Sequence, residues 1–404
     1  MDQDAMVRER LPEPIRHLAG EIMDVDSHEQ IPAQLWEQEI GPITRELAAL
    51  WMDDGQDYRS DRNHPNVPGY TTDAAPISLD TLWKNKGCIA PGAVDIGRRP
   101  AVMDMMGVKR QLMFPTAGLH CVHLLTDLAY AEKLERNRSD YARDLIKAYN
   151  KWGVEVARKS DRVRPVLPLI ADSPAALLRQ AQELINDGIR AFWIPSRLPP
   201  GGVSPAHPDL DPLWALLAAN NAPVCLHITS DSHIFWTDVW REAPAFAGFL
   251  TLGEFKVDPW SMVNMHTMSQ NMLSTMVLGG VFERHPMLRM GISELGGFWI
   301  GPLCDTMDLW FHKSIGSITD RMSLPHEPSY YVKRNVRVSP FDFENVQKYI
   351  ATYDLEDVFA FASDYPHIEG GFDPINRLYM ELAPLGQEVV EKFFVKNGKW
   401  LLPD

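Results

Sequence analysis

The feature that most constrains the fold is a regular alternation of short apolar runs with stretches of helical periodicity from about residue 100 onward. The runs have the length and composition of strands, and the stretches between them place apolar residues at helical spacing. The strand-like runs are 111–115, 163–169, 189–194, 222–227, 288–293 and 358–363, and the helical stretches are 124–159, 173–187, 210–220, 268–283 and 346–353. This alternation predicts parallel βαβ units. With the run that begins at Ile22, roughly eight strands are expected, the number that closes an α/β fold into a (β/α)8 TIM barrel.

Residues 36–97 interrupt this rhythm. They are rich in Asp, Asn, Pro and Gly and carry few strand signals, so we interpret them as a long insertion after the first strand. A loop of that length is usually functional, most often as a lid or a contact surface. Barrels with insertions reach 404 residues as one domain. We therefore expect a single domain over residues 1–404, with 36–97 as a lid or dimer-contact segment within it.

Composition excludes several classes of protein. The formal charge of −15 comes without a basic patch, which argues against a nucleic-acid partner. No uncharged apolar run approaches the ~18 residues of a membrane span, and residues 1–16 lack the apolar core of a signal peptide. The four cysteines are scattered, in no paired spacing, at Cys88, Cys121, Cys225 and Cys304. They predict reduced thiols in a cytoplasmic protein. The partner that we expect is a small-molecule substrate.

Metal-competent side chains follow several of the predicted strands. Asp26 and His28 lie two residues apart after the first strand, so they point the same way, with Asp24 on the same face. His227 ends the run 222–227. Glu294 follows the run 288–293, just before Gly296-Gly297, and Asp364 follows the run 358–363, in Ser-Asp-Tyr-Pro-His. Active sites of such barrels lie at the carboxyl ends of the strands. If the barrel closes, these side chains meet and can hold a divalent cation.

Several of these segments also resemble a known family. They are Asp24-Val25-Asp26-Ser27-His28, Leu226-His227, Gly279-Gly280-Val281-Phe282-Glu283-Arg284-His285-Pro286 and Ser363-Asp364-Tyr365-Pro366. Together they resemble the amidohydrolase superfamily, in its aminocarboxymuconate semialdehyde decarboxylase-like branch. The resemblance implies a distorted barrel with a divalent metal at Asp26, His28, His227 and Asp364, and a homodimer. The chain departs from the family at Asp26, where a histidine is usual, and at Glu294, where decarboxylases carry an acid/base histidine.

A carboxylate-rich site favours iron or manganese, with zinc as an alternative. Glu294 could bridge to a second ion, helped by His266, Glu29 or the pair His120 and His123, although a helical surface facing solvent or substrate is the more common place for that pair. His266 is the further catalytic candidate, and its alternative is a solvent-facing histidine at a helix start.

For the substrate, Trp236, Trp260 and Trp299 lie beside the candidate ligands in sequence and suggest an aromatic pocket for a bulky, largely apolar compound. His367 is expected to support Asp364 or to touch the substrate. Arg98 could hold an anionic group, or pair with acids as arginines in a first helical turn usually do.

The leading functional hypothesis is a metal-dependent hydrolase, in which a metal-activated water attacks a carbonyl, Asp364 takes the proton and Glu294 bridges or acts as acid/base. Decarboxylation is the close variant, disfavoured by the missing histidine. The alternative from another class is a non-haem diiron monooxygenase on the same barrel, acting on a terpenoid-like or other secondary-metabolite substrate. A barrel without activity is disfavoured, because every predicted ligand position carries a competent side chain.

Overall fold

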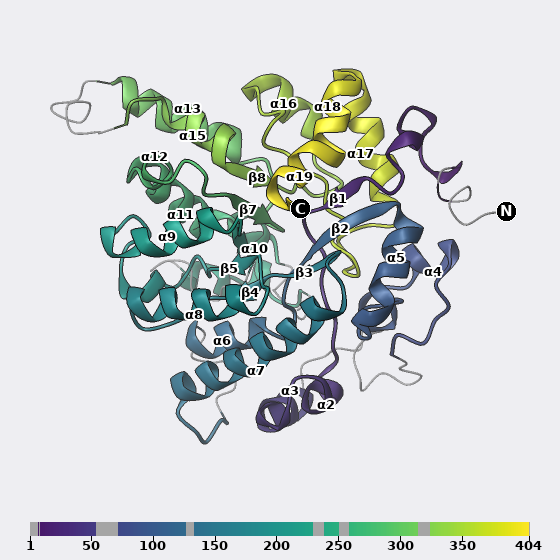
Figure 1. Cartoon of the computed structure of the whole chain (residues 1–404), viewed down its shortest axis with the longest axis vertical. Coiled ribbons are helices and arrows are strands. Elements are labelled where there is room, and N and C mark those ends of the chain that lie inside the picture. Colours follow the sequence, from purple (N-terminus) through teal and green to yellow (C-terminus); the bar gives the residue numbers. More distant parts are fainter. Residues whose placement is uncertain are drawn as a thin grey trace.

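A ring of parallel strands, surrounded by helices, forms the centre of the molecule in the computed structural model (Figure 1). The structure describes residues 7, 9–53, 72–126, 133–228, 238–249, 258–313 and 324–403. Its strands form two parallel sheets, β1-β2-β3 and β4-β5-β6-β7-β8. Their bounds are β1 Ile22–Asp24, β2 Val108–Met113, β3 Val163–Pro165, β4 Leu167–Pro168, β5 Phe192–Trp193, β6 Val224–His227, β7 Met290–Ser293 and β8 Val336–Val338.

Backbone hydrogen bonds join the two sheets into one closed barrel. β3 and β4 are a single run interrupted at Val166, whose amide donates to Met113 of β2. Pro165 and Pro168 bring no N–H to the ladder, which accounts for the short strands there. On the other side, Phe359 bridges Val338 of β8, and the amide of Val25 donates to Phe361. The segment around Phe359–Phe361 therefore fills the gap between β8 and β1, which confirms the predicted (β/α)8 barrel.

Two predicted elements differ from the structure. The stretch 124–159 is not one helix, because α6 spans Leu119–Thr126 and α7 spans Arg138–Lys159. Asn137 caps α7 by accepting a hydrogen bond from the amide of Asp140, so the second helix begins anew at a polar residue. Strand β8 was not predicted, since Val336-Arg337-Val338 is too short to show a period. The last predicted strand, 358–363, is held by bridges rather than by a full ladder.

Helices cover the outside of the ring (Figure 1). Those that pack around the strands are α5 Arg99–Met106, α7, α8 Pro174–Asn186, α9 Asp211–Ala219, α11 Thr267–Leu278, α12 Val281–Arg284, α13 Ile300–His312, α15 Pro328–Asn335, α16 Val346–Tyr353, α17 Pro374–Leu382, α18 Gln387–Glu391 and α19 Asn397–Leu401. Strands β1, β6 and β7 are buried along their whole length, as expected where helices cover one face and the barrel interior the other. Met23, Leu112, Trp193, Cys225 and Ala360 belong to the smaller of two apolar clusters, and the larger one packs strands against helices.

The segment 36–97 contains helices and turns and, in its described part, no strand. Its helices are α2 Trp36–Glu39, α3 Arg45–Asp53 and α4 Leu79–Lys84. Tyr141 of α7 holds the start of α3, since its hydroxyl donates to the carbonyl of Ile43 and accepts from the amide of Leu47. The roles of this segment as lid or dimer contact, and the single domain over 1–404, stay predictions.

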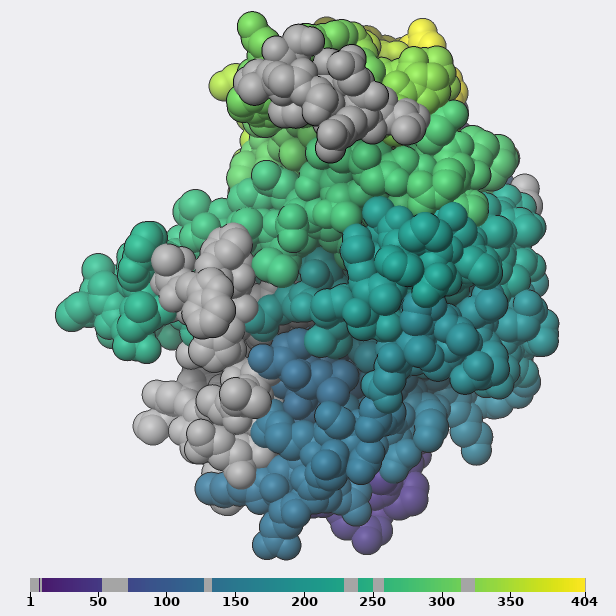
Figure 2. All heavy atoms as spheres, turned by 90° about the vertical axis from the view of Figure 1, so that its left-hand side faces the viewer, coloured from purple at the N-terminus to yellow at the C-terminus, as the bar shows by residue number. Residues whose placement is uncertain are grey.

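Three further observations complete the description. No helix among the described residues is both long and apolar enough to cross a membrane. The four cysteines, all within the described residues, are buried and form no disulfide bond. Segment 238–249, which follows α9 and β6 in the chain, stands out from the molecular surface at the left of Figure 2 and exposes Val239, Trp240 and Phe249.

Candidate metal centre

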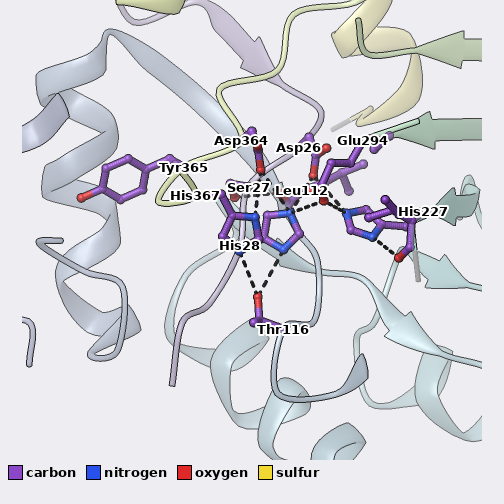
Figure 3. Close-up of polar contacts among 12 residues, drawn as sticks. Asp26, Ser27, His28, Leu112, Thr116, His227, Glu294, Asp364, Tyr365 and His367 are labelled. Atoms are coloured by element: carbon purple, nitrogen blue, oxygen red, sulfur yellow. Dashed lines mark hydrogen bonds and ion pairs between the residues drawn. The ribbon is translucent and has the colours of Figure 1, made fainter. Parts of the chain in front are cut away.

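Asp26 and His28 enter the barrel after β1 has ended at Asp24. Ser27 bridges Tyr365 and His28 bridges Phe114, so the chain here runs between the last strand and the end of β2. Both side chains are buried in the barrel mouth. His227 ends β6, Glu294 follows β7, and Asp364 follows the last strand. Figure 3 shows these side chains pointing toward one another.

The donor atoms of these residues lie within contact distance. His28 Nε2 is 3.3 Å from Asp26 Oδ1, 3.6 Å from Glu294 Oε2 and 3.5 Å from Asp364 Oδ1. His227 Nε2 is 2.9 Å from Glu294 Oε2 and 3.9 Å from Asp26 Oδ1. Two overlapping groups, each with its donor atoms within 4.8 Å of one another, follow from this: Asp26, His28, His227 and Glu294, and His28, Glu294, Asp364 and His367. The structure thus brings together all five predicted metal ligands.

Burial sets the electrostatics of this cluster. It raises the pKa of Asp364 to about 6, lowers that of His227 to about 3, and lowers that of His28 well below its usual value. The imidazoles are therefore held neutral, the form in which histidine binds a metal, and do not balance the carboxylates. A bound cation would stabilise buried carboxylates at this spacing in their charged form. This donor set of carboxylate oxygens and imidazole nitrogens fits Mn²⁺, Fe²⁺ or Zn²⁺.

Glu294 and Asp364 have an unusual backbone conformation. Their φ angles are 55° and 50°, in the left-handed region that residues other than glycine rarely adopt. Such strain costs of order 1–3 kcal/mol and is characteristic of functional sites. Both residues come at the turn out of a strand, where the left-handed conformation aims each carboxylate into the barrel mouth.

Asp24 does not point into the cluster, although its position two residues before Asp26 predicted the same face. Its carboxylate accepts hydrogen bonds from the amide and hydroxyl of Ser363 and, at 2.7 Å, from Gln111 Nε2. Because Gln111 belongs to β2 and Ser363 to the last strand, Asp24 links both neighbours of β1. The prediction assumed a strand running through 24–28, whereas β1 ends at Asp24.

The other candidates for a second ion also lie elsewhere. Glu29 Oε1 accepts from the amides of Thr116 and Ala117 and from the Tyr149 hydroxyl, so this carboxylate supports the turn after β2. His120 and His123 are buried rather than exposed, and the ring of His120 packs 4.6 Å from Trp36 and 4.6 Å from Trp51. Neither histidine is in a candidate metal group of the described residues.

The predicted substrate-binding tryptophans, Arg98 and the acid/base candidate His266 are not among the ligand groups of the described residues. His266 precedes α11 and stacks on Trp299 with 5.6 Å between ring centroids, outside both ligand groups. Trp299 is buried and donates to the carbonyl of Leu295, and Trp260 lies on α10, Pro259–Asn264. Arg98 is bound to Asp73 and to the carbonyl of Ala75, the alternative that the sequence left open. Trp236 lies outside the described residues.

His367 contacts Asp364, one of the two roles expected for it, and also belongs to the second ligand group. Its Nδ1 is 3.1 Å from Asp364 Oδ1, and its ring stacks on that of His28 with centroids 3.9 Å apart. Sequence reasoning missed Thr116, whose hydroxyl reaches both rings, because a lone threonine after a strand carries no signal of its own.

A pocket opens onto the cluster. Its lining is mostly acidic and small, and consists of Asp26, Glu294, Ser339, Pro340, Phe341, Asp342, Ala362, Asp364, Glu369 and Gly370. None of the predicted tryptophans in the described residues lines it. Asp342 and Glu369 had no sequence motif to single them out, since each follows a strand end by several residues.

Comparisons with known proteins agree with this architecture. An amidohydrolase from Mycobacterium avium subsp. paratuberculosis is 18% identical, with a TM-score of 0.63 over 95% of this chain and 99% of that one. A 2,6-dihydroxybenzoate decarboxylase from Rhizobium is 15% identical, with a TM-score of 0.56 over 94% and 98%. A dihydroxybenzoic acid decarboxylase from Polaromonas, solved with manganese and 2-nitroresorcinol, is 13% identical, with a TM-score of 0.58 over 94% and 96%.

No curated protein matches the chain by sequence. A family model described as amidohydrolase matches residues 92–403, which span the barrel from α5 to the end of α19 and include three of the five clustered side chains. The chain therefore belongs to the amidohydrolase family of metal-dependent enzymes.

Proposed function

We propose that this enzyme is a hydrolase that cleaves an uncharged carbonyl compound with a bulky, largely apolar body, using one divalent metal ion. The observation that carries the proposal is the lining of the pocket, in which five carboxylates surround the entrance to the metal centre: Asp26, Glu294, Asp342, Asp364 and Glu369. Small-molecule binding in such a pocket is decided by charge as much as by shape.

We assign separate roles in metal binding and catalysis to the residues of the cluster. Asp26, His28, His227 and Glu294 would hold the ion, which when bound lowers the pKa of water and polarises a carbonyl. Asp364 takes the proton of the attacking water, a role that suits a carboxylate whose pKa burial has raised toward neutrality. His367 Nδ1, 3.1 Å away, orients that carboxylate.

The charge of the pocket favours hydrolysis over decarboxylation. The solved neighbours include decarboxylases of dihydroxybenzoates, whose substrates are anions. Here one divalent ion would leave the pocket net negative, so an anionic substrate would be repelled. Lys86 is near, but its ammonium donates to the carbonyl of Gly371 and is not part of the lining. Glu294 also stands where an acid/base histidine would serve a decarboxylase.

Exposed apolar side chains adjoin lining residues of the pocket, by a ring contact or in sequence, and support an apolar substrate body. Phe343 is 61% exposed and stacks on Phe341, a lining residue, with centroids 5.1 Å apart. Ile368 and Phe372, 60% and 62% exposed, flank the lining residues Glu369 and Gly370 in sequence. An apolar compound would gain about 25 cal/mol for each Å² buried against them.

The test is the full-length chain loaded with Mn²⁺, Fe²⁺ or Zn²⁺ and offered neutral aryl esters, lactones and anilides, with hydroxybenzoates in parallel. We expect acid release from a neutral compound, slowed at least ~100-fold in Asp364→Ala and His227→Ala. The matched controls are Asp172→Ala and His312→Ala, whose side chains are largely exposed and far from the cluster in the chain. Carbon dioxide release from hydroxybenzoates that outpaces every hydrolysis would overturn the proposal.

A second candidate, the diiron oxygenase, is favoured by one observation: the two ligand groups overlap, sharing His28 and Glu294. Two adjacent ions bridged by Glu294 would use all six side chains. Its test is the metal content of chain purified from iron-replete cells without chelator. About two irons per chain, with oxygen consumption in the presence of substrate, would replace the hydrolase proposal; about one metal ion supports it.

A further inference from the structure

We propose that the Thr116 hydroxyl is a positioning group that fixes the tautomers of His28 and His367, so that His28 binds the metal ion and His367 donates a hydrogen bond to Asp364 instead of binding metal. The inference rests on the proposed metal site. Thr116 Oγ1 lies 3.4 Å from His28 Nδ1 and 3.3 Å from His367 Nε2 (Figure 3).

The position of Thr116 is set by its backbone. Its amide donates to Glu29 Oε1 at 2.8 Å, and the next amide, that of Ala117, donates to the same oxygen at 2.7 Å. Tyr149 of α7 donates its hydroxyl to this oxygen at 3.1 Å. The buried Glu29 carboxylate therefore holds the turn after β2 in place, and the Thr116 side chain is directed at the two stacked imidazoles.

Proton counting gives the direction of each hydrogen bond. His28 Nε2 faces three carboxylates, so a metal ion at that place needs this nitrogen unprotonated, and the ring proton is then on Nδ1. His28 Nδ1–H donates to Thr116 Oγ1, and the hydroxyl donates its own proton to His367 Nε2. The proton of His367 is then on Nδ1, which lies 3.1 Å from Asp364 Oδ1 and donates to it.

The arrangement with both histidines bound to metal is less favourable. Each ring would then carry its proton on the nitrogen that faces Thr116, and both would donate to Oγ1. The hydroxyl has one proton of its own, and in the described part of the chain these two rings are its hydrogen-bonding neighbours. That proton would be left without an acceptor at a side chain that is 7% exposed, which carries a desolvation penalty.

The experiment compares Thr116→Val, which removes the hydroxyl, with Thr116→Ser, which keeps it. Zinc affinity of the full-length chain is measured by competition with a chelator. We expect Thr116→Val to weaken zinc binding roughly 10- to 100-fold, the usual effect of removing a group that orients a ligand, and Thr116→Ser to stay within about 3-fold of wild type. Thr44→Val is the matched control. Thr44 is the last residue of η3, Pro42–Thr44, and its hydroxyl donates to the carbonyl of Gly41, away from the metal centre.

The tautomers are read directly by ¹⁵N NMR of histidine-labelled, zinc-loaded wild-type chain, with His367→Gln to assign the signal. We expect His367 protonated on Nδ1, and this measurement stands even if Thr116→Val does not fold. Wild-type zinc affinity in Thr116→Val, or His367 protonated on Nε2, would overturn the inference while leaving the hydrolase proposal intact. A wild-type chain that takes up no divalent metal would instead overturn the hydrolase proposal, and the inference with it.

Discussion

Asp24 joins β1 to its two neighbours through its carboxylate, although it lies only two residues before a candidate metal ligand. It is fully buried and receives hydrogen bonds from Gln111 and from the amide and hydroxyl of Ser363. Asp26, by contrast, faces His28 and His227. Two aspartates that lie two residues apart therefore have different roles. Asp24, the last residue of β1, links neighbouring strands, and Asp26, beyond the end of β1, is a candidate metal ligand.

We predict that Asp24→Ala lowers stability and leaves metal stoichiometry unchanged. The substitution leaves a buried hydroxyl, an amide N–H and an amide side chain without their acceptor, at a cost of about 3–5 kcal/mol in the free energy of unfolding. Urea denaturation measures this, and metal analysis of the folded variant at saturating metal measures the second part. Asp172→Ala is the control. A stable variant that had lost its metal would place Asp24 among the ligands instead.

At the scale of elements, Glu344 links the turn after β7 to the turn after β8. Its carboxylate accepts from the amides of Gly297 at 3.0 Å, Phe298 at 3.1 Å and Phe341 at 2.8 Å. One turn follows Glu294 and the other carries pocket residues, so this carboxylate sets the pocket wall. We predict that Glu344→Ala costs about 3 kcal/mol in stability, measured by urea denaturation. Glu327→Ala, at an exposed glutamate paired with His312, should cost at most about 1 kcal/mol; equal losses in the two variants would contradict the prediction.

The same carboxylate predicts a pH dependence. Burial raises the pKa of Glu344 above its usual 4.5, against the hydrogen bonds from the three amides and Tyr349. The native state therefore keeps a proton that the unfolded chain has released, and stability falls as pH rises from about 4.5 through the native pKa. Relative to Glu344→Gln, which does not titrate, the wild type should be less stable at pH 8 than at pH 5. Urea denaturation at both pH values tests this, and a difference that is constant or of opposite sign would refute it.

Elements were predictable from the sequence where an apolar run or period was clear, and side-chain positions where a strand end fixed them. The run 222–227 yields β6 and places His227, because its apolar residues and its terminal histidine lie in one short segment. Val336–Val338 has three residues, too few for any period to show. The roles of Thr116, Asp342 and Glu369 depend on which loops meet at the barrel mouth. The residue pattern of one sequence does not show which loops these are. Arg98 was a candidate for binding an anionic substrate group because of its residue type alone. The structure pairs its guanidinium with Asp73 instead.

At the scale of the whole molecule, the metal centre lies where the barrel closes. The candidate ligands Asp26 and His28 follow β1, His227 ends β6 and Glu294 follows β7, so an ion there would tie together segments from both sheets. Without an ion, the buried carboxylates repel one another across that closure.

We predict that metal removal destabilises the entire chain. An ion held at 1,000 times its Kd would contribute about 4 kcal/mol, so dialysis against EDTA should lower the Tm by several degrees, and added Mn²⁺ or Zn²⁺ should restore it. His227→Ala, which lacks one ligand, should melt at nearly the same temperature with and without metal. Differential scanning calorimetry on the full-length chain measures both effects. Because the ion would bind the native state alone, the rise in Tm should grow with the free metal concentration. A wild-type Tm that does not depend on metal would show that the cluster holds no ion. Protonation would then have to explain how Asp26, Glu294 and Asp364 are buried so close together.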